Sequence, residues 1–209
     1  MSVERREHEV LRQEGSLELR RYPAYLTASV TVNAGGHNEA AYAGFGPLAD
    51  YIFGNNAAAG SIPMTAPVTT SRSAGTKIEM TVPVTSERTR NEQLEGVSPL
   101  CTVHCAGEYV VRFTMPSRFG SVEELPEPNN PRVAIETVPE HHAVAARFGG
   151  RLDDETVAAA VTQLEAWIAR EGFTAIGEPE AAQFDAPWKP GFVRHNEVVI
   201  PVTMPADAR

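Results

Sequence analysis

The chain has 209 residues, of which 42% are hydrophobic and 22% are charged, a composition typical of a folded globular protein. The formal net charge of −9 and the scatter of the 18 lysines and arginines argue against nucleic acid as a partner. No apolar run approaches the roughly 20 residues of a membrane span, and the first residues lack the pattern of a secretory signal. We therefore expect a cytoplasmic protein with no membrane span.

The first residues of the chain predict strands. The stretches HEVLRQE, SLELRRYP and AYLTASVTV alternate apolar and polar residues, with turns at Gly15 and Pro23. The next stretch, residues 33–56, changes to helical spacing, with apolar positions at Ala41, Phe45, Leu48 or Ala49, and Ile52. Because Gly44, Gly46 and Pro47 are poor helix formers, we expect an irregular or broken helix, with Asn38 as N-cap and Gly54 as C-cap.

Two similar strings follow the predicted helix. SIPMTAPVTT begins at Ser61 and KIEMTVPVTS begins at Lys77, and both alternate as half-buried strands do. The polar and glycine-containing residues between them predict a hairpin loop. We therefore expect the two strings to be adjacent antiparallel strands, and the later stretch EYVVRFTMP to join the same sheet.

The second half of the chain repeats the order of the first. RVAIETVP and HHAVAARFGG are predicted strands, and FTAIGEP and HNEVVIPV are two more. A strong helix is predicted between the two pairs, at residues 153–172. Asp153 or Asp154 is the expected N-cap of this helix and Gly172 its C-cap. Its predicted apolar stripe comprises Val157, Val161, Leu164 and Ile168.

Matching features of the two halves are separated by nearly constant distances along the chain. Pro23 precedes Pro139 by 116 residues, and Pro83 precedes Pro201 by 118. We therefore predict an α+β fold, a distorted antiparallel β-barrel built from two duplicated β-α-β-β units and flanked by two main helices. The whole chain, 1–209, is expected to form one domain, with halves at about 8–85 and 108–202 and an extra segment at about 86–131 that overlaps the join.

Several of these stretches together resemble one protein family. In chain order, ELRRYP, AGFGPLADYIFGNN, IPMTAPV, IEMTVPV, VVRFTMP, LPEPNNPRV, AVAARFGG and FDAPWKPGFVRHNEV are similar to the SOUL haem-binding protein family, from about residue 8 to 202. The doubled MTxPV strings and the P-x-K-P…NE ending are its specific elements. The family's fold, two β-α-β-β units around a distorted antiparallel barrel, is the one predicted above.

The resemblance implies a ligand and a site. SOUL proteins bind tetrapyrroles, chiefly haem, non-covalently in an open apolar site between the first helix and the loop before the last strand. Carried onto this chain, that site comprises Tyr42, Phe45, Ala49, Phe184 and Lys189. Two positions depart from the family's pattern: Asp50 replaces a basic residue near the end of the helix, and Arg194-His195 replaces a pair of arginines.

The chemistry of haem fits these residue types, although each has a plainer explanation. A haem site needs apolar walls and one or two cations, which Tyr42, Phe45 and Lys189 could supply. Core packing would explain the same spacing of Tyr42 and Phe45, and a solvated loop would explain Lys189. His37, after two glycines at the helix start, is the most accessible candidate to ligate the iron, and binding without a protein ligand is the alternative.

Other candidate sites carry less weight. Cys101, His104 and Cys105 lie within five residues, but no second ligand pair has zinc-finger spacing, so we expect neither a structural metal nor a disulfide framework. Methionines 64, 80 and 115 are expected to fill the core. No motif indicates catalysis, so we expect a non-catalytic binding protein. The alternatives are an effector-sensing module for amphiphilic organic ligands and an enzyme that modifies a tetrapyrrole.

Overall fold

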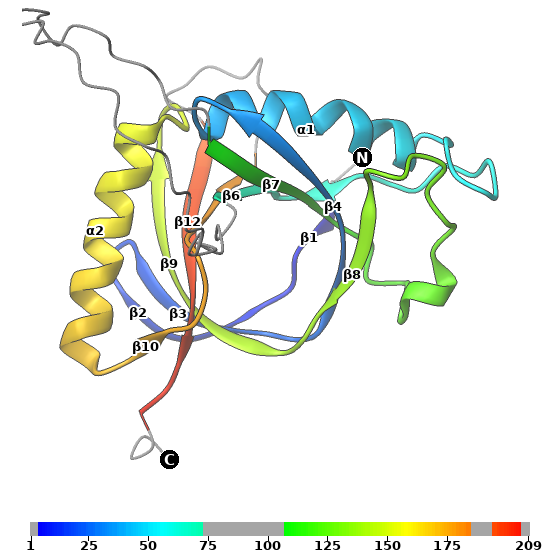
Figure 1. Ribbon diagram of the computed structural model, residues 1–209. Helices are drawn as coiled ribbons and strands as arrows, with labels where there is room; N and C mark the ends of the chain where they lie inside the picture. Colours follow the sequence, from blue (N-terminus) through cyan, green and yellow to red (C-terminus); the bar gives the residue numbers. More distant parts are fainter. Residues whose placement is uncertain (1–3, 73–106, 185–193, 206–209) are drawn as a thin grey trace, which may run out of the picture.

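The computed structural model describes residues 4–72, 107–184 and 194–205, in which two helices lie against one large antiparallel sheet (Figure 1). This confirms the predicted α+β class. None of the described helices is long and apolar enough to cross a membrane. In chain order the elements are β1 (Glu4–Arg5), β2 (Glu9–Glu14), β3 (Leu17–Tyr22), β4 (Tyr25–Ala34), α1 (His37–Ile52), β5 (Thr65–Ala66), β6 (Val68–Arg72), β7 (Gly107–Thr114), the short 3-10 helix η1 (Val122–Glu124), β8 (Ala134–Val138), β9 (His141–Gly149), α2 (Asp154–Glu171), β10 (Thr174–Ala175), β11 (Glu180–Gln183) and β12 (His195–Thr203).

The sheet curls strongly but does not close within the described residues. Its strands follow the order β2-β3-β9-β12-β11-β6-β7-β4-β8, with β10 paired to β12. The path ends at β2 and β8, which pair only with β3 and β4 in this part of the chain. All six residues of β2 are exposed, and this edge carries charged side chains, which discourage further pairing. The predicted barrel is therefore corrected to an open, curved sheet with both helices outside the curve (Figure 1).

The sheet continues in a corresponding way on the two sides of the β6–β11 pair. On each side, the next strand is the one that follows later in the chain, and the strand after it is the one that precedes the helix. One side contains β6, β7 and β4 with α1, and the other contains β11, β12 and β9 with α2. Each side thus has a β-α-β-β order in the chain, but the last strand of the first side, β7, comes from the segment predicted as extra rather than from the string at residues 77–86. A common order does not show that one half was copied from the other, so the internal duplication stays a prediction.

The two repeated strings were predicted to pair as a hairpin, but the observed pairing of the first string contradicts this. Residues 68–71 of β6 pair with β11 along one edge and with β7 along the other. No edge of this stretch remains for a hairpin partner, so β7 takes the place predicted for KIEMTVPVTS. That string, residues 77–86, lies outside the described residues.

Helix α1 is continuous, contrary to the predicted break, and Pro47 lies within it. Its N-cap is Gly36 rather than Asn38, and its C-cap is Phe53 rather than Gly54. Because Gly36 has no side chain to cap the helix, Asp154 does so from α2: its Oδ1 accepts a hydrogen bond from the His37 backbone N–H at 3.0 Å. The helix is thus capped by tertiary contact.

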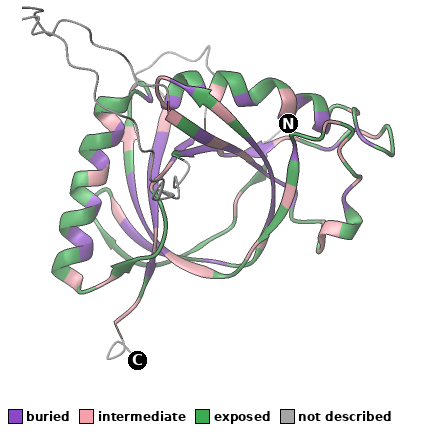
Figure 2. Ribbon diagram, viewed as in Figure 1, coloured by how far each residue is buried: buried purple, intermediate pink, exposed green. Residues whose placement is uncertain are grey.

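Helix α2 follows the sequence prediction closely. Asp153 and Thr156 form a reciprocal capping box, and Gly172 ends the helix in the left-handed conformation at φ 71°. Of the predicted stripe, Val157, Leu164 and Ile168 are buried and Val161 is half-buried, and Trp167 is buried as well. In Figure 2 the exposed residues of α2 lie on the side turned away from the sheet.

The two faces of the sheet differ in chemistry. The outer face carries one apolar cluster under α1, with Leu26, Val111 and Phe113, and another under α2, with Val144 and Val198. Because successive strand residues point to opposite faces, the intervening residues lie on the inner face. That face contains the charged side chains described below, together with a small apolar cluster of Tyr22, Ala143, Ala145 and Val199.

Candidate functional site

The outward face of α1 exposes large apolar side chains. Tyr42 is 61% exposed and Phe45 39%, and Phe53, just past the helix, is 66% exposed. Ala49 is buried on the same side of the helix, since positions 42, 45, 49 and 53 share one helical face. The Phe45 ring packs edge-on against Phe113 of β7, at 5.4 Å between centroids, which fixes its position from below.

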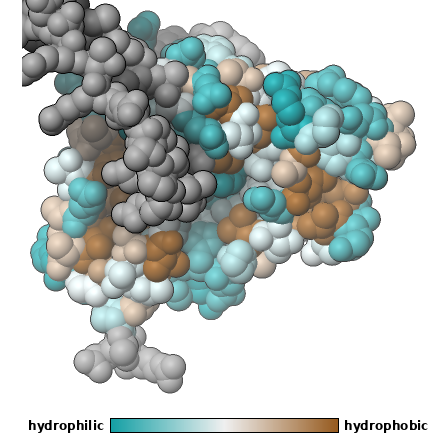
Figure 3. All heavy atoms as spheres, viewed as in Figure 1, coloured by the Kyte–Doolittle hydropathy of each residue, from teal (hydrophilic) through white to brown (hydrophobic). Residues whose placement is uncertain are grey.

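This exposure bears on the two explanations of the helix aromatics. Tyr42 is not covered as a core residue would be, whereas Phe45 is partly covered by Phe113. Figure 3 shows apolar residues on this face of the molecule, over α1 and over the segment between β7 and β8. Sequence reasoning missed Phe53, although it lies four residues after Ala49 and inside the helix end predicted at Gly54.

Phe184 has different neighbours. Its ring stacks on His195 at 4.6 Å, and the Arg5 guanidinium lies 5.7 Å from its centroid. Among the described residues, no ring contact joins Phe184 to Tyr42 or Phe45. Lys189 lies outside the described residues, so its position stays a prediction.

His37 lies in the core, so the expectation that it is accessible is wrong. The residue is 8% exposed, its Nδ1 lies 2.9 Å from Thr70 Oγ1, and its ring meets Tyr109 edge-on at 5.1 Å. Burial lowers its pKa, which keeps the imidazole neutral near pH 7. The glycines before His37 do not expose it, because α1 begins directly over β6 and β7.

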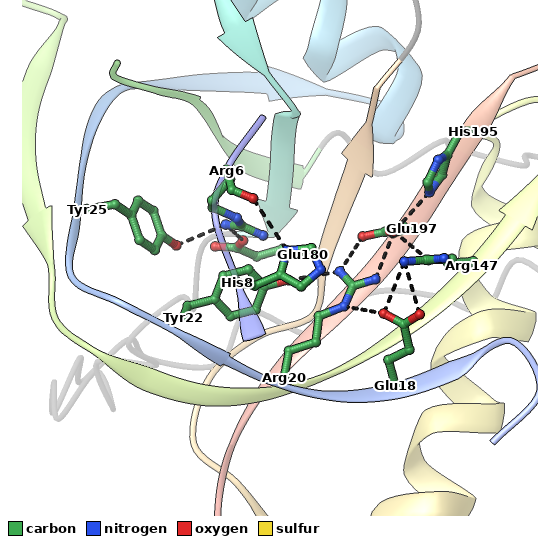
Figure 4. Close-up of polar contacts among 10 residues, drawn as sticks. All are labelled: Arg6, His8, Glu18, Arg20, Tyr22, Tyr25, Arg147, Glu180, His195 and Glu197. Atoms are coloured by element: carbon green, nitrogen blue, oxygen red, sulfur yellow. Dashed lines mark hydrogen bonds and ion pairs between the residues drawn. The ribbon is translucent and has the colours of Figure 1, made fainter. Parts of the chain in front are cut away.

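A network of buried charges lies on the inner face of the sheet, and sequence reasoning did not identify it (Figure 4). Arg20 donates two hydrogen bonds to Glu197, at 2.6 and 2.9 Å, and one to Glu18 at 2.8 Å. Arg147 contacts the same two carboxylates, at 3.0 and 3.2 Å, and His195 Nε2 lies 2.9 Å from Glu197. The sequence contained an indication of this network, because charged residues occupy alternate positions in the predicted strands SLELRRY and HNEVV.

The network is electrostatically satisfied. Burial would raise the pKa of Glu197, but the hydrogen bonds and charge of Arg20, followed by those of His195, lower it to about 2. Burial would lower the pKa of Arg20, but its bonds to Glu197 and Tyr22 raise it instead. Both groups therefore stay charged at neutral pH, and they link β3 to β12 across β9.

A small cavity lies against the N-terminal segment. Its volume is about 200 Å³, and Arg6, Tyr25, Leu26, Met115 and Phe119 are among the residues that line it. Ligand pockets for drug-sized molecules usually measure roughly 300–1,000 Å³. The cavity is therefore too small to enclose a tetrapyrrole.

The described side chains offer no evident metal centre. Within residues 4–72, 107–184 and 194–205, no group of three or more His, Cys, Asp or Glu side chains could hold a metal ion. The stretch that contains Cys101, His104 and Cys105 lies outside these ranges.

Comparison with known families decides the family of the chain. The pattern described as SOUL heme-binding protein matches residues 3–76 and 70–201, nearly the whole length. The chain belongs to the SOUL haem-binding family. A search of curated proteins found no match.

Solved structures show the same fold at low sequence identity. The C-terminal domain of EcmrR is 14% identical, with a TM-score of 0.60, over 90% of this chain and 98% of that one. A hydrolase from Listeria innocua is 12% identical, with a TM-score of 0.55, over 90% of this chain and 92% of that one. At such identities the likeness concerns the fold alone.

The stretches that carry the SOUL resemblance also build the inner face. ELRRYP contributes Glu18, Arg20 and Tyr22, and the NE of the C-terminal motif is Asn196-Glu197. Asn196 is fully buried, and its Nδ2 donates to the Gly150 carbonyl at 3.0 Å. These parts of the SOUL pattern therefore hold the sheet together, whereas Tyr42 and Phe45 of α1 are exposed.

Proposed function

We propose that this SOUL protein binds haem or another tetrapyrrole non-covalently on the outward face of α1, as a carrier, buffer or sensor. The observation that carries the proposal is the exposure of two aromatic side chains on this face, Tyr42 and Phe45. A flat apolar ring laid on this face would cover area that now contacts water, which is favourable at about 25 cal/mol per Å².

The described residues fit an open site better than an enclosed one. The cavity of about 200 Å³ cannot hold the ring, whereas Tyr42 on the helix face is 61% exposed. The second wall in this proposal is the segment before β12, with Phe184 at its start and Lys189 within it. Lys189 would pair with a propionate carboxylate when haem is bound.

The proposal does not depend on iron ligation by His37. The Nδ1 of this residue is engaged by Thr70, and its ring packs on Tyr109. We expect His37→Ala to lower thermal stability but to change haemin affinity by less than about tenfold, or roughly 1.4 kcal/mol. Complete loss of binding in a folded His37→Ala protein would instead make it the axial ligand.

A haemin titration followed by visible absorption tests the proposed site. The parent should bind in the micromolar range, at roughly −8 kcal/mol, and Phe45→Ala should weaken binding by about 1–3 kcal/mol. Ile176→Ala is the matched control, because Ile176 is also a large apolar residue, 56% exposed, but follows β10 rather than lying on α1. Equal losses in the two variants, or none in Phe45→Ala, would place the site elsewhere.

A second variant tests the predicted cation. Lys189→Glu should weaken haemin binding further, because it sets a carboxylate against the propionates, and the added loss should shrink at high salt if the pair is exposed. No added loss in Lys189→Glu would contradict this pairing.

A further inference from the structure

The N-terminal segment places a cation inside an aromatic and acidic enclosure on the inner face. The guanidinium carbon of Arg6 lies 4.5 Å from the ring centroid of Tyr22 and 5.2 Å from that of Tyr25. Arg6 Nη1 donates to the Tyr25 hydroxyl at 2.9 Å and lies 3.6 Å from Glu180 Oε2. The Arg6 side chain is only 6% exposed, although it comes from a segment near the chain terminus. We call Tyr22, Tyr25 and Glu180 the cation cage (Figure 4).

The walls of the cage are held by contacts that do not involve Arg6. The Tyr22 hydroxyl accepts from Arg20 at 3.0 Å, and its ring stacks on His141 at 5.3 Å. The Tyr25 ring lies 6.1 Å from that of His141. Glu180 lies 3.8 Å from Arg112, whose Nη1 donates to Ser71. The cage should therefore keep its shape when Arg6 leaves.

The segment that carries Arg6 is attached by few bonds. β1 is two residues long and pairs in parallel with β5, and the Arg6 amide donates to the Ala66 carbonyl at 2.9 Å. The Glu4 carboxylate also accepts from the Ser117 amide, at 2.8 Å. The cage is thus a built site filled by a lightly held part of the same chain.

We propose that the cation cage is a second ligand site, specific for small alkylguanidinium compounds, which compete with Arg6 for it. A guanidinium is planar and delocalised, so it stacks on tyrosine rings while donating to a carboxylate and a hydroxyl. The cavity of about 200 Å³ adjoins Arg6 and Tyr25 and is lined by Leu26, Met115 and Phe119. It would accommodate a short apolar substituent on the guanidinium.

The proposal selects among cations. A quaternary ammonium ion has no N–H groups, so it could stack on the tyrosines but could not donate to Tyr25 or Glu180. A neutral alkylurea has a similar shape but lacks the charge that Glu180 requires. The order of affinity should therefore be alkylguanidinium, then quaternary ammonium, then alkylurea.

The first experiment empties the cage with Arg6→Ala and measures N-ethylguanidinium binding by calorimetry, with N-ethylurea and tetramethylammonium as comparison ligands. Arg6→Ala should bind N-ethylguanidinium at least tenfold more tightly than the parent does, and Glu180→Gln in the same background should reverse the gain. Arg12→Ala is the control, because Arg12 pairs with Glu171 in an exposed position outside the cage. The proposal fails if folded Arg6→Ala gains no affinity, if Arg12→Ala gains as much, or if N-ethylurea binds equally well.

A second experiment uses the unaltered chain, so it decides the question even if Arg6→Ala does not fold. The Nε–H signal of Arg6 in a nitrogen-15 NMR spectrum should be displaced by the two tyrosine rings. Added N-ethylguanidinium should move that signal toward the position of an exposed arginine, and N-ethylurea should not. An Arg6 signal that stays unchanged while N-ethylguanidinium rises to saturating concentration would overturn the proposal.

Discussion

The two helices lie against corresponding parts of one sheet, yet they use their apolar residues differently. α2 turns Leu164 and Trp167 inward, and both are almost completely buried. α1 buries Leu48 and Tyr51 but leaves Tyr42 and Phe45 exposed. α2 also supplies its own caps, whereas the first backbone N–H of α1 depends on Asp154 of α2. α2 therefore buries its large apolar side chains, whereas α1 leaves part of its own exposed at the surface.

The contrast extends to the inner face. Next to the α2 half, Glu18, Arg20 and Glu197 form a buried charged network. Next to the α1 half, the buried inner-face residues of β4 and β6 are mainly hydroxyl side chains, Thr27, Ser29, Thr69 and Ser71. Changes that remove burial or charge should therefore affect the two halves unequally, and the following experiments test that inequality.

The largest difference is expected between Leu164→Ala and Phe45→Ala. Leu164 is 0% exposed in the α2 cluster, so its truncation leaves a cavity and should cost about 2–5 kcal/mol of unfolding free energy. Phe45 is already 39% exposed, so its truncation should cost far less, about 1 kcal/mol. Urea denaturation of both variants measures this. Similar losses would show that Phe45 is a core residue and that the helices do not differ as described.

Acid should lower the stability that the charged network contributes. Because the pKa of Glu197 is about 2 in the fold and 4.5 in an unperturbed glutamate, its ionised carboxylate stabilises the fold fully above about pH 4.5. That contribution, roughly 3 kcal/mol, disappears as pH falls toward 2. Stability measured against pH should therefore fall in that window, and Glu197→Gln should flatten the fall while lowering stability at pH 7. Glu39→Gln, in α1, is the control and should keep the parent profile.

Two glycines of α1 should respond oppositely to alanine. A Cβ at Gly44 would collide with the Val111 side chain, so Gly44→Ala should cost about 1–3 kcal/mol. A Cβ at Gly46 would meet nothing within 4 Å, so Gly46→Ala should stabilise the helix by up to about 1 kcal/mol. Thermal unfolding of the two variants separates these effects. A stable Gly44→Ala protein would mean that α1 lies less closely on β7 than described.

The smallest difference concerns the caps. Asp153→Ala removes the side chain that accepts from the Thr156 amide and should cost about 1 kcal/mol. Asn38→Ala should change stability by only a few tenths of a kcal/mol, because Asn38 is exposed and does not cap α1. Urea midpoints of the two variants give the comparison. A larger loss in Asn38→Ala would restore the N-cap that the sequence predicted.

The sequence by itself determined most of the local structure, because the causes are local. Period-two alternation located β3, β4, β9 and β12, and Asp153 and Gly172 bounded α2 through bonds made within a few residues. The aromatics Tyr42 and Phe45 were also identified as a candidate site before their exposure was known. What the spacing could not decide was which side of α1 would face the sheet, since a core stripe and a ligand-binding stripe have the same period.

Only the tertiary structure decided the remaining features, because each depends on residues far apart in the chain. Residues 68–71 of β6 pair with β7 along one edge and with β11 along the other, so this stretch has no edge left for the hairpin that the proximity of the repeated strings suggested. The first backbone N–H of α1 is bonded by Asp154, 117 residues away, which no local rule for N-caps could supply. The pairing of Arg20 with Glu197, 177 residues apart, likewise exists because β9 brings β3 and β12 to its two edges. Local bonds follow from neighbouring residues, whereas these contacts follow from the order in which the strands assemble.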